Sequence, residues 1–122
     1  MVKIKVVLGK MVKKEKPFDE DLYKKVRITE LILFSINSII ENKEKCTLER
    51  LIKECFTFFP KVFGFPQYPQ WPDSLKLDRQ LRTLRKRKLI IGDPKTTFSL
   101  TKIGQKIAVE LAKTFRQRKL FK

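Results

Sequence analysis

The sequence predicts a mainly α-helical domain with a small β-hairpin, built as a three-helix core, the hairpin and a C-terminal helix. Apolar residues recur at helical spacing in four segments, at about 22–42, 48–59, 74–88 and 102–115. Two short β-prone runs, 89–91 and 96–100, flank the turn sequence Gly-Asp-Pro-Lys. The chain has 122 residues, 42% of them hydrophobic, which is enough for one modest core.

The first 27 residues form a basic N-terminal extension ahead of the predicted domain, residues 28–112. Residues 2–8 begin by alternating apolar and basic side chains, a pattern compatible with a half-buried strand and equally with a flexible basic arm. Residues 13–21 are charged and contain Pro17, which suits a linker or the start of a helix.

The first predicted helix, 22–42, is expected at the centre of the core because its apolar face is broad. Its apolar positions are Leu22, Val26, Leu31, Phe34, Ile36, Ile39 and Ile40. A polar turn follows, and Thr47 can then cap a second helix. The apolar stripe of that helix is Leu48, Leu51, Ile52, Cys55 and Phe59.

Residues 59–72 form a loop rich in proline and aromatic residues. Pro60 ends the second helix, and three further prolines exclude a regular helix until Asp73. The aromatic residues are Phe63, Phe65, Tyr68 and Trp71. These rings either cover the small core as a lid or form an exposed contact patch. The rarity of exposed aromatic clusters on monomers favours the lid.

The third predicted helix, 74–88, is capped by Asp73 or Ser74 and has one leucine face and one cationic face. Leu77, Leu81 and Leu84 form a narrow stripe toward the core. The opposite side carries Lys76, Arg79, Arg82, Thr83 and Lys86, with Gln80 and Arg87 on one flank and Arg85 on the other. Asp78 is the sole acid after the cap, so repulsion between the cations goes largely unrelieved without a bound anion.

The hairpin is followed by a helix that Thr101 can cap. The apolar stripe of this helix is Ile103, Ile107, Ala108, Leu111 and Phe115. Gly104 lies in its first turn, where the missing side chain lets the preceding strand pass close by. Residues 113–122 form a basic C-terminal tail, and residues 116–122 are expected to fray.

The net charge of +16 is concentrated in three segments. Residues 1–16 carry +5, residues 76–88 carry +6 and residues 113–122 carry +5, while the remaining segments nearly cancel. A solvated lysine-rich surface is the alternative, but acidic residues then usually rise with the basic ones. Here they do not, which favours a polyanionic partner.

Several function classes are disfavoured by composition. The chain has no histidine and only two cysteines, which excludes Ser-His-Asp and Cys-His catalysis and leaves too few ligands for a structural zinc site. Cys55 falls on an apolar stripe, which favours a buried reduced thiol. No glycine-rich phosphate loop and no membrane-length apolar run occurs. We therefore expect a cytoplasmic protein that is not an enzyme, with no metal, no cofactor and no membrane partner.

The order of helices and hairpin resembles a winged helix-turn-helix domain over about residues 28–112. Residues 98–104, Phe-Ser-Leu-Thr-Lys-Ile-Gly, are similar to the aromatic-x-Leu-Thr-x-x-Gly signature that closes the wing in PadR-like and MarR-like regulators. Residues 84–90 are similar to the passage from recognition helix into first wing strand. The loop 59–72 and the first 27 residues depart from the minimal domain.

The resemblance implies duplex DNA binding, sequence-specific or sequence-independent, by a nucleoid-associated transcriptional regulator or accessory protein. Helix 74–88 would enter the major groove, and the wing 89–100 would follow the backbone or minor groove. The residues expected to face bases are Arg79, Gln80 and Thr83. Those expected at phosphates are Lys76, Arg82, Lys86 and Lys95, with Arg87 joining the DNA-binding set from the flank.

Two further expectations concern partners. The first helix, the N-terminal segment or the last helix could supply a homodimer interface, since regulators commonly match the symmetry of duplex half-sites. The competing function is a protein–protein or RNA interaction module that docks its partner through the loop 59–72. In that case Phe65, Tyr68 and Trp71 are the expected contact residues.

Overall fold

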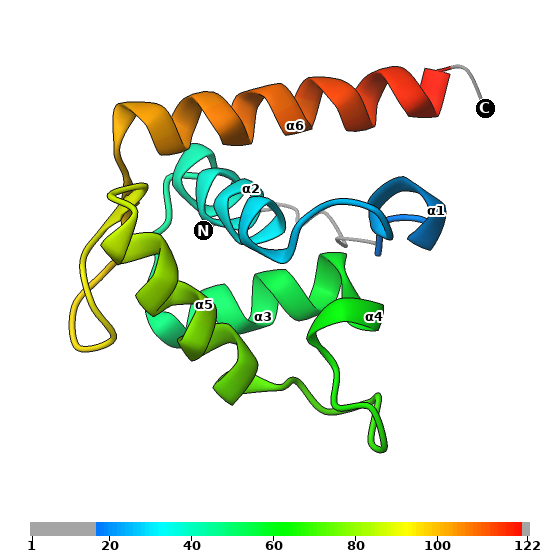
Figure 1. Cartoon of the computed structure of the whole chain (residues 1–122), viewed down its shortest axis with the longest axis horizontal. Coiled ribbons are helices and arrows are strands. Elements are labelled where there is room, and N and C mark those ends of the chain that lie inside the picture. The colour runs from blue at the N-terminus through cyan, green and yellow to red at the C-terminus, as the bar shows by residue number, and fades with distance from the viewer. Residues whose placement is uncertain (1–16, 121–122) are drawn as a thin grey trace, which may run out of the picture.

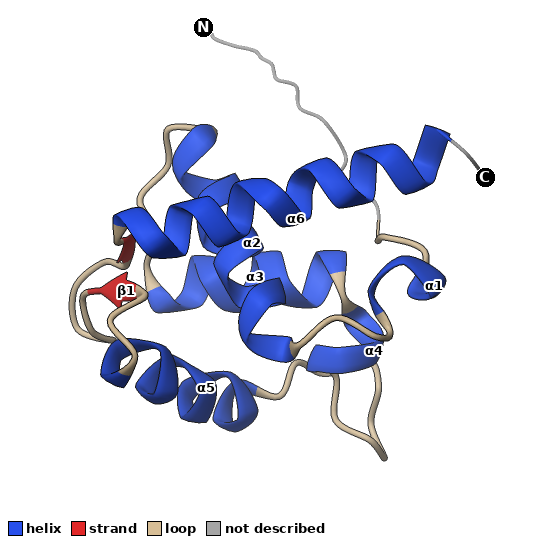
Figure 2. Ribbon diagram, turned by 45° about the horizontal axis from the view of Figure 1, so that its top comes forward, coloured by secondary structure: helices blue, strands red, loops and turns tan. Residues whose placement is uncertain are grey.

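The computed structural model describes residues 17–120, so the strand or arm considered for residues 2–8 lies outside it. In this range the chain forms six helices and one small antiparallel sheet (Figure 1; Figure 2). The helices are α1 (Glu20–Tyr23), α2 (Ile28–Glu41), α3 (Leu48–Phe58), α4 (Pro60–Phe63), α5 (Ser74–Lys86) and α6 (Lys102–Leu120). The strands are β1 (Ile90–Ile91) and β2 (Ser99–Leu100). The predicted class, mainly helical with one hairpin, is confirmed.

Helix α2 lies at the centre of the core, as its broad apolar face predicts. α6 runs across one side of it, and α3 and α5 lie on the other side (Figure 1). Five of its aliphatic side chains are at most 1% exposed, namely Leu31, Ile32, Leu33, Ile36 and Ile39. Burying each of them contributes about 1.5–3 kcal/mol of transfer free energy, so α2 makes a large contribution to the hydrophobic stabilisation.

The single helix predicted over residues 22–42 is wrong, because the chain breaks between α1 and α2. Asp19 caps α1, and Arg27 takes an extended conformation before α2 begins. No glycine or proline lies between residues 22 and 28, so local propensity gives no sign of the break. On the N-terminal side of this break, Leu22 and Tyr23 of α1 are buried at 3% and 1% exposure.

An aromatic cluster fills the space between the chain before α1 and helices α2, α3 and α6. The ring of Phe18 lies 5.5 Å from that of Phe59 and nearly parallel to it, and 5.0 Å from that of Phe115. The backbone N–H of Phe18 donates to the carbonyl oxygen of Phe58 at 2.9 Å. The described part of the N-terminal extension therefore belongs to the packed core rather than to a separate arm.

Helix α6 extends into residues 116–120, part of the segment that was expected to fray. α6 continues to Leu120, since Phe115 is 2% exposed in the aromatic cluster. The Nη1 atom of Arg118 also donates to the carbonyl oxygen of Leu22 at 2.9 Å. At the other end of α6 the predicted apolar stripe is wrong for Ile103, which is 63% exposed.

The second helix is confirmed, with Thr47 as its cap. Its Oγ1 atom accepts a hydrogen bond from the N–H of Arg50 at 3.2 Å. The two cysteines are free and buried, as expected for Cys55. Burial raises the pKa of the Cys46 thiol to about 12, and burial also raises the pKa of Cys55, so both thiols are protonated at neutral pH.

A buried carboxylate joins α2 to α3. The side chain of Glu54 is fully buried, and it accepts hydrogen bonds from Ser38 Oγ at 2.8 Å and Arg50 Nη1 at 2.7 Å. Arg50 also pairs with Glu44 at 2.9 Å. The charge of Glu54 is thus neutralised within the core, and this acid has a structural role.

The prolines after α3 do not exclude all helix, which corrects the prediction for residues 60–72. Pro60 is the first residue of α4, a position that suits proline because the first N–H of a helix has no partner within it. After α4 the loop is closed by an isolated bridge between Gly64 and Pro72. The irregular segment is therefore shorter than predicted and is pinned at its base.

The predicted hairpin is confirmed, with Ile90 paired to Leu100 and Ile91 to Ser99. Gly104 packs as predicted. A Cβ atom at this position would collide with the carbonyl oxygen of Leu89, just before β1. The close approach of α6 to the hairpin therefore requires glycine.

Candidate nucleic-acid interface

Helix α5 presents one face to the core and the other to solvent. Asp73 caps it, with Oδ1 accepting from the N–H of Lys76 at 3.1 Å. Leu77, Leu81 and Leu84 are at most 2% exposed, as the leucine stripe predicts. The helix has 13 residues. It is therefore roughly 20 Å long, enough to follow a groove of a nucleic-acid duplex.

The solvent-facing side of α5 carries cations that can bind an external anion. Arg79, Lys86 and Arg87 are exposed, and none forms an ion pair with any residue that the structure describes. Arg82 is exposed and pairs with Asp78 at 3.0 Å. Such a surface pair contributes at most about 1 kcal/mol, so Arg82 can exchange the carboxylate for another anion at little cost.

Two of the residues predicted at this surface are placed differently. Lys76 is half-buried, and its Nζ donates to the carbonyl oxygen of Val62 at 2.8 Å, so it ties α5 to the end of α4. In this conformation Lys76 is therefore not available for the phosphate expected there. Gln80 is also half-buried, and the Thr83 hydroxyl donates within the helix to the carbonyl of Arg79 at 3.4 Å. Of the three expected base-facing residues, only Arg79 combines exposure with uncommitted donors.

The C-terminal end of α5 is joined rigidly to the hairpin. Lys88 adopts a φ of 58°, in the left-handed region where glycine is usual. The N–H of Leu89 then bonds to Leu84 O at 3.0 Å, and the Thr101 hydroxyl donates to Lys88 O at 3.0 Å. A further backbone bond, from Phe98 N to Cys46 O at 2.8 Å, attaches the hairpin to the segment before α3.

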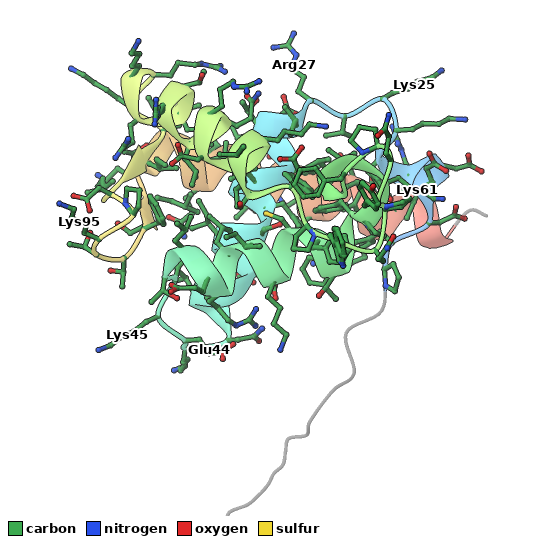
Figure 3. All side chains as sticks on the ribbon, turned by 90° about the horizontal axis from the view of Figure 1, so that it is seen from below. Lys25, Arg27, Glu44, Lys45, Lys61 and Lys95 are labelled. Carbon is green, nitrogen blue, oxygen red and sulfur yellow. The ribbon has the colours of Figure 1, made fainter. Side chains whose placement is uncertain are left out.

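The hairpin carries Lys95 at its tip, beyond the end of α5. Lys95 is exposed, and its backbone N–H donates to Asp93 Oδ1 at 2.8 Å, which shapes the turn. Figure 3 shows Lys95 at one end of the molecule rather than among the α5 side chains. The structure therefore separates this residue from the rest of the predicted set.

Sequence reasoning missed two cations on the same side as α5. In Figure 3 the side chains of Lys25 and Arg27, in the connection between α1 and α2, point to the edge formed by α5, whereas Glu44 and Lys45 point to the opposite edge. Both cations are exposed and have no ion pair among the described residues. They lie about fifty residues from α5 in the chain, so no local pattern connects them with it.

The aromatic loop acts as a lid only in part, which corrects the expectation that its rings cover the core. Phe63 is buried and Phe65 is half-buried, but Tyr68 and Trp71 are 51% and 55% exposed. Figure 1 shows the loop projecting from the body beside the N-terminal end of α5. The two exposed rings are therefore available for contact.

Comparisons with known proteins assign this chain to no family. No protein-family model matches the chain, and no curated protein or solved structure matches it significantly. Over residues 17–120, no group of three or more acidic or cysteine side chains is placed to hold a metal ion. No helix in this described range is long and apolar enough to cross a membrane.

Proposed function

We propose that the chain is a winged helix-turn-helix protein that binds duplex DNA through the exposed face of α5. The hairpin would act as the wing. Lys25 and Arg27 would contact further phosphates of the DNA backbone next to those bound by α5. The observation that carries the proposal is the set of exposed cations Arg79, Lys86 and Arg87 on α5 and its C-terminal cap, which have no ion pair among the described residues. Arg79 and Lys86 lie two helical turns apart. The protein would act as a regulator or accessory protein on the nucleoid, in the cytoplasm.

The arrangement of elements supports the wing assignment. α2, α3 and α5 provide the three core helices, and the hairpin and α6 follow in the order that the wing resemblance implies. The backbone bond between Phe98 and Cys46 attaches the hairpin to the segment between the first two of these helices. This holds the hairpin beside the end of α5, where it would reach the backbone of a duplex lying on that helix.

Binding through phosphates is expected to outweigh base recognition. Long cationic side chains dominate the exposed face, while Gln80 is half-buried and the Thr83 hydroxyl already donates to the backbone. Phosphate contacts position a protein but carry no direct sequence information. We therefore expect only modest discrimination between duplex sequences, with Arg79 as the main source of any base preference.

A salt titration with duplex DNA tests the proposal. If six to ten phosphates are contacted, the binding constant is expected to fall by about three to five orders of magnitude between 50 and 200 mM salt. Fluorescence anisotropy with a labelled duplex gives this slope directly. Absence of binding at low salt, or a slope near zero, would contradict the proposal.

A pair of lysine-to-glycine substitutions distinguishes an effect on DNA affinity from an effect on the stability of the fold. Lys43 and Lys88 end α2 and α5 in the left-handed region, with φ of 62° and 58°. Lys43→Gly and Lys88→Gly are each expected to raise the free energy of unfolding by about 0.5–1 kcal/mol, because glycine adopts this conformation without a Cβ clash. Only Lys88→Gly should weaken DNA binding, by several-fold, because Lys88 directly follows the α5 cations.

Chemical denaturation and anisotropy on the same samples check both parts of this expectation. Lys43→Gly is the matched control, because it removes the same charge from the same backbone conformation. Its neighbours Glu44 and Lys45 point away from the α5 edge (Figure 3). Equal loss of DNA affinity in the two variants would show that net charge alone governs binding.

A further inference from the structure

The rings of Tyr68 and Trp71 form an exposed stack at the projecting loop. Their centroids lie 5.0 Å apart and their planes differ by 19°. The two residues remain 51% and 55% exposed. Two stacked, nearly parallel rings present a flat apolar surface to solvent. Exposing such a surface to water is unfavourable in free energy unless another group covers it.

The loop holds this stack in place through its own backbone. The N–H of Phe65 donates to Trp71 O at 3.0 Å, and those of Tyr68 and Trp71 donate to Phe65 O at 3.2 Å and Tyr68 O at 3.0 Å. At the base, Asp73 N donates to Phe63 O at 2.6 Å. The Lys76 Nζ bond to Val62 O at 2.8 Å then fixes α4 against the first turn of α5. The stack is therefore pre-positioned relative to α5.

The chain segment that carries the stack is cationic or neutral. Residues 55–72 contain no aspartate or glutamate, and Lys61 is exposed on α4. Asp73, the next acid in the chain, is committed to capping α5. The first exposed cation of α5, Arg79, follows one to two turns further on. An apolar flat surface next to cations matches the chemistry of a nucleic-acid strand, whose bases stack and whose phosphates are anionic.

We propose that Tyr68 and Trp71 form a stacking platform for an unpaired nucleobase at the end of a duplex that lies along α5. Inside a duplex both faces of each base are covered by neighbouring pairs, and at a blunt end only the outer face of the terminal pair is open. A base in a single-stranded tail or gap can leave the duplex stack, so it reaches the platform more readily than a paired base. The preferred substrate is then a junction between double-stranded and single-stranded DNA. The inference rests on the proposed duplex binding, which orients the DNA along α5. It adds to that proposal the class of DNA that the protein prefers.

The experiment compares three DNA ligands that share one duplex. The first is blunt, the second has a short unpaired tail, and the third has a tail of the same length made of abasic nucleotides; tails are placed on either strand in turn. The abasic tail has the same number of phosphates but no bases. The difference in affinity between the two tailed ligands therefore reports the contribution of the bases and not that of the extra negative charge. Trp71 is the only tryptophan of the chain, so its fluorescence reports on the platform alone.

The tail with bases is expected to bind roughly tenfold more tightly than the abasic tail and to quench Trp71. Tyr68→Ala should reduce the quenching, and Trp71→Ala should abolish the affinity difference while leaving affinity for the blunt duplex unchanged. Trp71→Phe, which keeps a ring, should retain most of the difference. Ile40→Ala is the control, since Ile40 is an exposed apolar residue at the far end of α2 from Arg27. Circular dichroism verifies that each variant is folded.

Other results separate this inference from the proposed function. Equal affinity for both tails with unchanged Trp71 fluorescence would overturn the platform, and blunt-duplex binding would still stand. Quenching by a single strand without any binding of the blunt duplex would support the platform and reject duplex binding. Retention of the tail preference in Trp71→Ala would also overturn the platform.

Discussion

Replacing Arg79, Lys86 and Arg87 together with alanine is expected to weaken duplex DNA binding by about two to three orders of magnitude at moderate salt. All three side chains are exposed on α5 and the residue that follows it, and they have no ion pair among the described residues, so their removal breaks no ion pair that supports the fold. The slope of the logarithm of the binding constant against the logarithm of salt concentration should also fall by about three, roughly one for each phosphate that is no longer neutralised.

The matched control removes the same charge elsewhere. Lys45, Lys53 and Lys113 are lysines on other parts of the surface, and Lys45 points away from the α5 edge (Figure 3). Their triple replacement with alanine should change affinity by only a small factor through the general field of the protein. Anisotropy titrations at several salt concentrations measure both variants. Equal weakening in the two variants would mean that binding is diffuse and that α5 is not the interface.

Gly104→Ala is expected to lower the free energy of unfolding by about 2–4 kcal/mol, although the same change in an ordinary helix raises it by about 1 kcal/mol. The added Cβ would collide with the carbonyl oxygen of Leu89. That oxygen cannot move freely, because it accepts from the N–H of Thr101 at 3.2 Å. Either α6 or the chain entering β1 must therefore shift.

Urea denaturation of Gly104→Ala and of Gln105→Ala measures this effect. Gln105 is the exposed neighbour on the same turn of α6, and its replacement should change stability by less than about 0.5 kcal/mol. Because the hairpin would be displaced from α5, any Gly104→Ala protein that remains folded should also bind duplex DNA more weakly. A stabilised Gly104→Ala variant would contradict the close packing of α6 on the hairpin.

Features that depend on neighbours in the chain could be predicted from the sequence alone. Thr47 and Asp73 cap helices because a side-chain oxygen can reach an N–H three residues ahead. The leucines of α5 face inward because their spacing matches the helical repeat. The same repeat accounts for the exposed side chains of α5 and its C-terminal cap, Arg79, Arg82, Thr83, Lys86 and Arg87.

Features that depend on distant groups are settled by tertiary packing. Lys76 lies on the polar side of its helix, but a carbonyl of α4 captures its ammonium group. Arg27 lies in the break before α2 and points to the α5 edge, and the residues 22–28 contain no glycine or proline that would indicate this break. The loop rings were expected to cover the core, yet Phe63 alone of them is fully buried, while Tyr68 and Trp71 stay in solvent. Local propensity is a property of a few consecutive residues, whereas the core has a limited volume that the whole chain shares. Which side chains fill the core is therefore decided only when all elements pack together.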